Sequence, residues 1–312
     1  MTSAAASCPF CKADRPVSGP GRLPGKDIAG FPEKTYRRCP ACGIIYLTRL
    51  DAPSVKYDKD YFFDSYKRQY GKTYLEDFPN LLEAGRRRLT HILNAHLCAF
   101  VPPCDEFMQK YSLLDIGCAY GPFLAAAAEA GFNPAGIEPV EDAAHYVREK
   151  LGFACWQGFF PDALPEEFRT QSNSETNPEP FDVISLWYVI EHFEEPGKML
   201  NEISRLLKNG GVLAFSTPSF SGISGRKSLR SFLKNSPPDH YTVWSPLACK
   251  KILKQYGFEL RKIVVTGHHP ERFPLLGRFV KTGSEGPLYR LLLFISRLFS
   301  LGDTFEVYAV KA

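Results

Sequence analysis

The feature that most constrains the fold is a glycine-rich turn between an apolar run and an alanine-rich run, within residues 112–132. The apolar run from Leu113 to Ile116 has the length and near-continuous hydropathy of a strand buried in a parallel sheet. The alanine-rich run from Phe123 to Ala130 has high helix propensity. A strand, a tight turn and a helix in this order predict a unit whose helix N-terminus can approach a ligand closely.

A second apolar run ends at Glu138, 21 residues after Gly117. A carboxylate about 20 residues after such a turn can accept hydrogen bonds from ribose hydroxyls. The turn has the spacing G-x-A-x-G at Gly117, Ala119 and Gly121, whereas dinucleotide-binding turns have the spacing G-x-G-x-x-G. Asp115, just before the turn, would repel a pyrophosphate but suits a ligand with an ammonium or sulfonium group. Glycine turns of this kind occur in proteins that bind dinucleotides, flavins and adenosyl compounds, and these details reduce the number of ligand classes that fit.

Residues 181–219 supply a further strand, a helix, a Gly-Gly turn and another strand. Together these motifs resemble the class I S-adenosylmethionine-dependent methyltransferases over about residues 85–312. The resemblance implies an α/β fold, a Rossmann-like seven-stranded sheet with helices on both faces and an antiparallel last strand. Strands are expected near 111–116, 134–138, 153–157, 181–187, 211–216, 258–265 and 304–311, and helices near 81–97, 121–131, 140–151, 196–208 and 245–256. Residues 170–180 are expected to form a polar loop.

The resemblance also implies which residues bind the cofactor S-adenosylmethionine. Its methionine part would lie on the turn, at Asp115, Gly117, Cys118, Ala119 and Gly121. Glu138 would accept the ribose hydroxyls, Pro139 would flank the adenine and Trp187 would form an adjacent wall. Relatives often carry an acidic residue after the third strand, where this chain has Phe159, so Gln157 or backbone groups would read the adenine.

Two histidines are candidate general bases. Many relatives carry a Glu-His pair after the fourth strand, here Glu191 and His192, and a histidine ahead of the penultimate strand, here His240. Methyl transfer from a positive sulfur depends mainly on positioning, and a base needs only to take the proton of the acceptor. The alternative for each histidine is a structural, hydrogen-bonded role.

Two C-x2-C pairs near the N-terminus predict a zinc site with four cysteine ligands, Cys8, Cys11, Cys39 and Cys42. The residues between the pairs are rich in Pro and Gly, so a bound metal rather than an apolar core would hold this segment together. With all four positions filled by protein, the ion would be structural. Iron in the same cage and a redox role are the alternatives.

The chain of 312 residues is expected to divide into a zinc-ribbon-like domain at 1–50, a bridge at 51–110 and a methyltransferase domain at 111–312. The bridge is rich in tyrosine and phenylalanine over 57–78, which predicts packing of the ribbon on the catalytic domain or, alternatively, a lid over the acceptor. No signal-peptide-like segment or apolar run of about 18 residues occurs, so a cytoplasmic protein without disulfides is expected.

The net charge of +4 is unevenly distributed, because residues 221–300 hold 14 Lys or Arg against 4 Asp or Glu. An insertion at 219–244 contributes Arg226, Lys227, Arg230 and Lys234. In the resembling fold this insertion overhangs the acceptor pocket, which suggests an anionic acceptor. A solvated basic face is the alternative.

These features favour methyl transfer to a small-molecule or glycan-type acceptor, such as a phosphate- or nucleotide-linked sugar. Some deoxysugar C-methyltransferases carry a similar N-terminal four-cysteine domain. The alternatives are a quinone or lipid-precursor O-methyltransferase, and an enzyme that binds RNA through its ribbon and basic segment. Residues 287–299 predict a short apolar helix that serves as a lid or dimer contact, lies in the core, or lies on a membrane surface.

Overall fold

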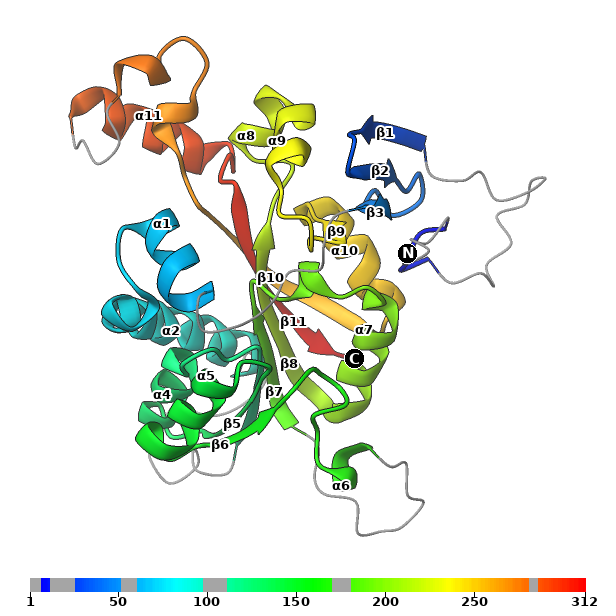
Figure 1. The fold of residues 1–312 in the computed structure, drawn as a ribbon, viewed down its shortest axis with the longest axis vertical. Coiled ribbons are helices and arrows are strands. Elements are labelled where there is room, and N and C mark those ends of the chain that lie inside the picture. The colour runs from blue at the N-terminus through cyan, green and yellow to red at the C-terminus, as the bar shows by residue number, and fades with distance from the viewer. Residues whose placement is uncertain (1–6, 12–25, 52–60, 98–110, 170–180, 281–285) are drawn as a thin grey trace.

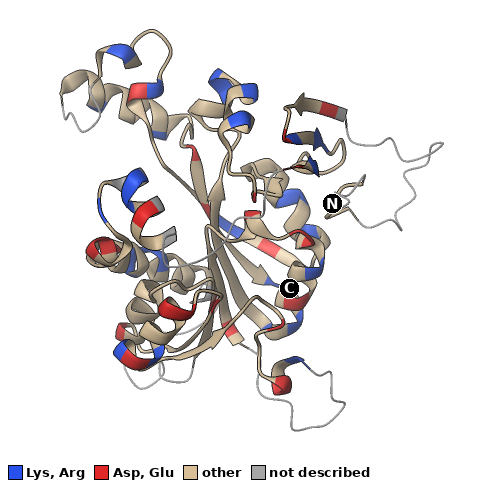
Figure 2. Cartoon of the chain, in the orientation of Figure 1, with Lys and Arg blue, Asp and Glu red and all other residues tan. Residues whose placement is uncertain are grey.

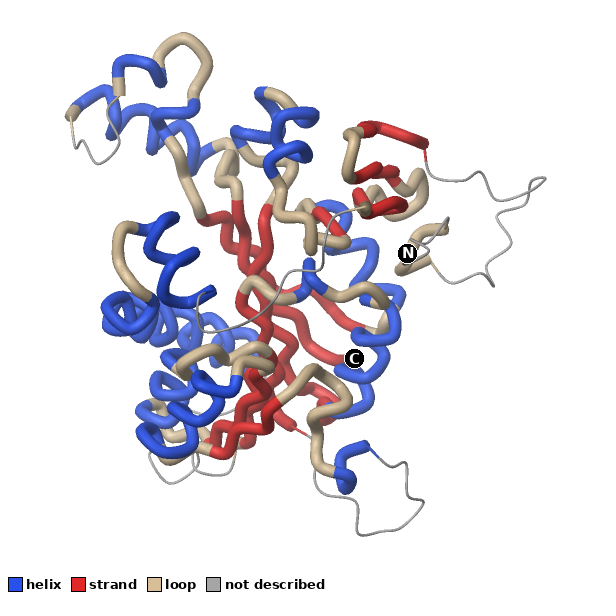
Figure 3. Tube along the Cα trace, in the orientation of Figure 1, coloured by secondary structure: helices blue, strands red, loops and turns tan. Residues whose placement is uncertain are grey.

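The computed structural model describes residues 7–11, 26–51, 61–97, 111–169, 181–280 and 286–312. These residues form a seven-stranded sheet in the order β10-β11-β8-β7-β4-β5-β6 and a four-stranded sheet in the order β1-β2-β3-β9. The large sheet runs through the centre of the molecule with helices on both sides (Figures 1 and 3). The Rossmann-like α/β fold expected from the sequence is confirmed.

All seven strands expected in the large sheet are present. They are β4 (Ser112–Ile116), β5 (Asn133–Glu138), β6 (Ala154–Gln157), β7 (Phe181–Trp187), β8 (Leu207–Pro218), β10 (Phe258–Thr266) and β11 (Thr304–Lys311). Strands β4 to β8 pair in parallel, whereas β11 pairs antiparallel with β8 and β10. The order reverses at β4, since β5 lies on one side and β7 on the other. In open α/β sheets, ligands bind at such a reversal, outside the carboxyl ends of the strands, which here are those of β4 and β7.

Two apolar layers cover the two faces of the sheet. Leu113 of β4 packs with residues of α2 (Tyr74–Leu97), α4 (Pro122–Glu129) and α5 (Glu141–Tyr146). Its neighbour Leu114 packs on the opposite side, with residues of α7 (Pro196–Leu206) and α10 (Pro246–Gln255). This alternation is the period of two expected for a strand that is buried on both faces.

Two helices differ from the sequence-based expectation. Helix α2 begins at Tyr74, seven residues before the expected start, because Thr73 and Glu76 form reciprocal capping contacts. The helix expected over 140–151 is split into α5 and a π-helical turn at Val147–Leu151, which ends at Gly152 with a positive φ of 73°. The loop expected at 170–180 lies outside the described residues.

The N-terminal segment joins the rest of the molecule through the small sheet. Its strands β1 (Lys26–Gly30), β2 (Lys34–Arg38) and β3 (Ile45–Leu50) are antiparallel, and β3 also pairs with β9 (Thr242–Val243), which lies at the end of the basic insertion. Phe10 packs edge-on against Trp244, with ring centroids 5.0 Å apart. Tyr256, which directly follows α10 (Pro246–Gln255), donates a hydrogen bond to the carbonyl of Phe10 at 2.8 Å.

Candidate functional site

The glycine turn follows β4 directly and places three small residues in the left-handed region, Gly117 (φ 73°), Ala119 (φ 50°) and Gly121 (φ 77°). The amide of Gly117 donates to the carbonyl of Ile137 at 2.8 Å, which fixes the turn against β5. A Cβ added at Gly117 would lie 2.6 Å from Val189, so only glycine fits where the loop after β7 approaches. The turn therefore offers a ligand mainly backbone groups, next to the N-terminus of α4.

Glu138 closes the turn from the end of β5. Its carboxylate accepts hydrogen bonds from the amides of Ala119 and Val140, both at 2.9 Å. Only 3% of Glu138 is exposed, and this burial raises its pKa to about 7. Pro139 follows and is half-buried. Glu138 thus links the turn to the end of β5, where folds of this kind place the carboxylate that binds ribose.

The other predicted turn residues lie beneath the crevice. Asp115 is buried within β4 and accepts a hydrogen bond from the hydroxyl of Ser185 at 2.6 Å, while burial raises its pKa to about 7. Cys118 is also buried, and its sulfur lies 3.7 Å from that of Cys155 on β6. A Cβ on Gly136 would meet the Cys118 sulfur at 2.5 Å, so this glycine makes room for the thiol.

The outer wall of the crevice is formed at the end of β6. Gln157 is exposed and lies opposite Glu138 in the parallel pairing of β5 and β6. The amide of Gly158 donates to the carbonyl of Glu138 at 3.0 Å. Phe159, which stands where relatives often carry an acidic residue, is 64% exposed.

Trp187 ends β7 on the other side of the turn. Its ring packs edge-on against Phe123 of α4 at 5.0 Å, and the guanidinium of Arg88 lies 4.1 Å from its centroid. The indole Nε1 is buried and has no hydrogen-bond partner among the described residues. The next residue, Tyr188, has a positive φ of 61° and is 43% exposed. A non-glycine residue in this conformation marks a locally strained loop at the edge of the crevice.

An aromatic cluster covers the glycine turn. Tyr120 within the turn contacts the rings of Phe62, Phe63, Tyr74 and Tyr146 at centroid distances between 5.3 and 6.1 Å. The aromatics of residues 57–78 were expected to pack the ribbon on the large domain or to form a lid, and those in this cluster pack on the glycine turn. Aromatic composition alone carries no information about the partner surface.

Both candidate histidines lie in one cluster. Their rings are perpendicular, with centroids 4.7 Å apart, although His192 follows β7 and His240 lies near the end of the basic insertion. Nδ1 of His192 lies 2.9 Å from Oδ2 of Asp239. Glu191 is buried beside them. One possible metal-ligating atom from each of Glu191, His192 and His240 lies within 4.8 Å of the others. This spacing suits proton transfer, and it would also admit a cation.

The two histidines differ in their electrostatics. Burial works against protonation of His192, but its hydrogen bond with Asp239 and the charge of Glu191 outweigh burial, so its pKa is raised. Burial and the neighbouring His192 lower the pKa of His240 to about 3. At neutral pH His240 is therefore an uncharged ring, whereas His192 can exchange a proton.

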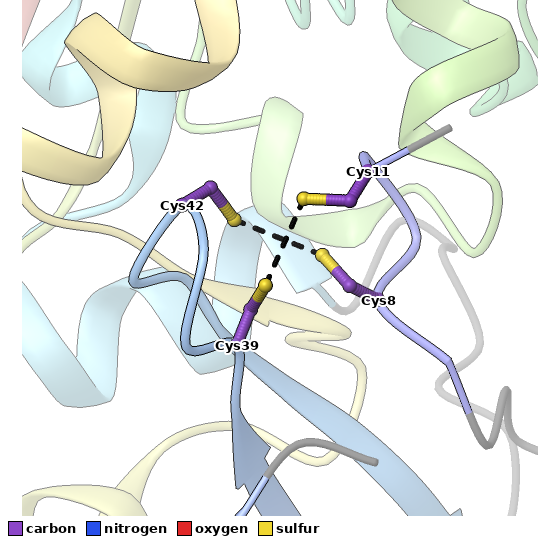
Figure 4. A group of neighbouring side chains, drawn as sticks. All are labelled: Cys8, Cys11, Cys39 and Cys42. Atoms are coloured by element: carbon purple, nitrogen blue, oxygen red, sulfur yellow. Dashed lines mark hydrogen bonds between the residues drawn. The ribbon is translucent and has the colours of Figure 1, made fainter. Parts of the chain in front are cut away.

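The four N-terminal cysteines converge on one point (Figure 4). The sulfur of Cys8 lies 3.7 Å from that of Cys42, and the sulfur of Cys11 lies 3.7 Å from that of Cys39. Four sulfurs around an ion with a Zn–S distance of about 2.3 Å would be about 3.8 Å apart. Gly43, with a positive φ of 85°, forms the turn after the second pair. The cluster therefore has the dimensions of a tetrahedral four-thiolate metal site.

Comparison with known proteins agrees with this geometry. Residues 72–263, more than half of the chain, match the family model described as "Methyltransferase domain". The chain belongs to this family. The methyltransferase uses S-adenosylmethionine, as the family match, the crevice and the fold together indicate.

Curated relatives of the methyltransferase include two ubiquinone biosynthesis O-methyltransferases. The one from Methylococcus capsulatus is 25% identical over 66% of this chain and 85% of its own length. The one from Actinobacillus pleuropneumoniae is 28% identical over 41% of this chain and 54% of its own length. Among solved structures, an S-adenosylmethionine-dependent methyltransferase from Archaeoglobus fulgidus is 16% identical, with a TM-score of 0.47 over 80% of this chain and all of that chain.

The structure of the methyltransferase brings the predicted residues together at two neighbouring places. The turn, Glu138 and Trp187 lie at the carboxyl ends of β4, β5 and β7, and the two histidines form a separate cluster. Sequence reasoning missed the aromatic cover around Tyr120 and the role of Asp239. Asp239 could have been recognised from its position directly before His240. Among the described residues, no helix of the methyltransferase combines the length and hydropathy that a bilayer span requires.

Proposed function

We propose that the methyltransferase transfers a methyl group to a small glycan-type acceptor that carries phosphate, such as a nucleotide-linked sugar, with His192 as the general base. The pairing of His192 with Asp239 next to the cofactor turn carries this proposal. In this arrangement the carboxylate holds the proton on Nδ1 and leaves Nε2 to accept a proton from the acceptor.

The residues of the crevice fit S-adenosylmethionine. The small left-handed turn leaves space for the cofactor, Glu138 would accept the ribose hydroxyls, and the unpaired Nε1 of Trp187 offers a buried donor. Gly121 would complete the turn, Pro139 would flank the adenine, and Gln157 would contact the edge of the adenine. When bound, the cofactor supplies an electrophilic methyl group on a positive sulfur. The buried walls exclude water from that group.

His192 is the base because its partner raises its pKa, whereas His240 has a pKa of about 3 and is a weak base at neutral pH. His240 would instead orient the acceptor through a hydrogen bond. A proton acceptor of this kind contributes roughly 10²- to 10⁴-fold to the rate.

The charge of the basic insertion supports an anionic acceptor. Helices α8 (Ile223–Lys227) and α9 (Leu229–Asn235) expose Arg226, Lys227, Arg230 and Lys234. Ammonium and guanidinium donors of this kind suit phosphate groups. A phenolic acceptor is the second candidate, because the curated relatives are named as ubiquinone biosynthesis O-methyltransferases.

The four-cysteine site would hold one structural zinc ion. All four positions are taken by cysteine, so no position is open for water or substrate. The ion would stabilise the small sheet, whose β3 pairs with β9 just after Asp239 and His240. The metal would therefore support the catalytic histidines indirectly.

The test is methyl transfer from labelled S-adenosylmethionine to a panel of nucleotide-linked sugars and catechol-type phenols. Transfer to a sugar nucleotide supports the proposal, and transfer only to phenols supports the second candidate. His192→Ala should reduce the rate by roughly 10²-fold or more while binding of S-adenosylhomocysteine is retained. Full activity of His192→Ala would exclude His192 as the base.

A further inference from the structure

The segment between β10 and β11 forms an arm at one end of the molecule (Figure 1). It leaves the sheet where Thr266 of β10 pairs with Thr304 of β11, which in turn pairs with Pro218 at the end of β8. Because β8 runs parallel to β7, and β7 to β4, this is the end of the sheet at which the cofactor turn lies. The described part of the arm comprises residues 267–280 and 286–303, including helix α11 (Pro287–Leu298).

The arm concentrates the exposed apolar surface of the molecule. Among the described residues ten large apolar side chains are exposed, and seven of them belong to the arm. These seven are Leu275, Leu276, Phe279, Leu291, Phe294, Leu298 and Phe299. Single exposed apolar residues are ordinary, but a group of them concentrated on one projecting segment marks an interaction surface.

Helix α11 has a distinct inner and outer face. Its inner face carries Leu292 and Ser296, both buried, and the Ser296 hydroxyl lies 2.7 Å from Nδ1 of His268. Its outer face carries Leu291, Phe294 and Leu298, at spacings of three and four residues that align them along the helix. The apolar outer face is therefore not needed to attach the helix to the protein.

Arginines flank this outer face. Arg290 and Arg297 are exposed and seven residues apart, which places them together along one side of Phe294. The guanidinium of Arg278 lies 4.7 Å from the ring centroid of Phe279. Helix α11 contains no Asp or Glu. The neighbouring helices α8 and α9 add exposed Lys and Arg at the same end of the molecule (Figure 2).

We propose that the arm docks the protein onto an anionic lipid bilayer, with the outer face of α11 and the residues around Phe279 inserted into the headgroup region. A bilayer surface offers both apolar contact and negative charge, and long arginine side chains can reach the headgroups from an inserted helix. A second copy of the chain fits less well, since it would bring the same arginines together. Docking at this end would turn the cofactor crevice toward acceptors held at the membrane.

The experiment is sedimentation of the full-length protein with vesicles of phosphatidylcholine alone and of phosphatidylcholine mixed with phosphatidylglycerol. The wild type should sediment with the anionic vesicles and much less with the neutral ones, and salt should weaken binding. Phe294→Ser combined with Leu298→Ser, and separately Arg290→Glu combined with Arg297→Glu, should each weaken binding by about tenfold or more.

Two exposed residues of α10 serve as matched controls, Leu247→Ser for apolar loss and Lys250→Glu for charge reversal, and both should bind as the wild type does. Circular dichroism and binding of S-adenosylhomocysteine should be unchanged in all variants, which separates this test from the test of methyl transfer. Wild-type protein that does not sediment with anionic vesicles would overturn the proposal. A dimer in solution that Phe294→Ser with Leu298→Ser dissociates, without vesicle binding, would assign the surface to a second copy instead.

Discussion

Nδ1 of His192 lies 2.9 Å from Oδ2 of Asp239, a residue 47 positions further along the chain. The histidine follows the parallel strand β7, and the aspartate lies in the basic insertion, just before β9. Their contact joins the large sheet to a segment that is distant in the sequence. It also distinguishes the electrostatic surroundings of two histidines that the sequence alone leaves equivalent.

Replacement of the aspartate should change the pH dependence of catalysis. In the wild type the base form of His192 is lost as pH falls through its raised pKa, so kcat/KM decreases on the acid side. Asp239→Asn removes the carboxylate that does most to raise this pKa, so burial is then opposed mainly by the charge of Glu191. The acid limb of kcat/KM should move to lower pH, and the plateau should fall by roughly 10²-fold or more because the tautomer is no longer fixed. Glu202→Gln on the surface is the control, and an unmoved limb in Asp239→Asn would contradict the assignment.

Glu138→Gln should separate cofactor binding from stability. The variant loses the charged acceptor for ribose hydroxyls, so the affinity for S-adenosylhomocysteine should fall by about 10- to 100-fold. Calorimetry measures this change, with Glu129→Gln on the exposed end of α4 as the control. Affinity equal to that of the wild type would exclude a ribose contact for Glu138.

The same variant should gain stability relative to the wild type as the pH rises from about 4.5 to 7. The folded-state pKa of Glu138, about 7, is above its unfolded value, so the folded protein binds more protons and its stability falls as pH rises between about 4.5 and 7. Glu138→Gln removes this dependence. The melting temperature of the variant relative to the wild type should therefore increase over that pH range, and a decrease would show that the backbone contacts of Glu138 outweigh its burial.

The strands could be predicted from the sequence because each is a short apolar run, and the positions of β4, β5 and β7 depend little on tertiary contacts. The glycine turn and Glu138 were recognisable for the same reason, since local chemistry specifies them. In contrast, β3 pairs with β9 across almost two hundred residues, at Tyr46 and Thr242, and no local pattern specifies that pairing.

The contact of His192 with Asp239 could not be predicted from the sequence for a related physical reason. The protonation behaviour of His192 and His240 depends on burial and on Asp239, which only the folded chain brings into contact. Likewise, the tyrosines and phenylalanines of the bridge were visible as composition, but their partner, Tyr120, could be found only from the packing.

Gly117→Ala should weaken cofactor binding more than its backbone cost alone explains. Gly117 and Gly210 both have positive φ angles, 73° and 79°, so alanine at either position should cost about 1–2 kcal/mol of stability. Only at Gly117 would the added Cβ meet a neighbour, at 2.6 Å from Val189, whereas nothing lies within 4 Å at Gly210. Gly117→Ala should therefore reduce affinity for S-adenosylhomocysteine, Val189→Ala in the same chain should restore part of it, and Gly210→Ala should leave it unchanged. An equal effect of both glycine variants on affinity would contradict this account of the turn.

Removal of the cysteine site should affect both stability and turnover. Cys39→Ser should lower the metal content from one ion per chain, as measured by mass spectrometry. It should also reduce the free energy of unfolding by several kcal/mol, because the metal holds this small segment together. Because β3 pairs with β9 just after His240, the loosened ribbon should displace Asp239 and His240, so kcat should fall more than cofactor affinity does. Cys249→Ala, a buried cysteine of α10 outside the cluster, is the matched control and should retain the metal and most of the activity. Full metal content in Cys39→Ser, or unchanged kcat in a protein that has lost its metal, would show that the ribbon and the histidines are not coupled in this way.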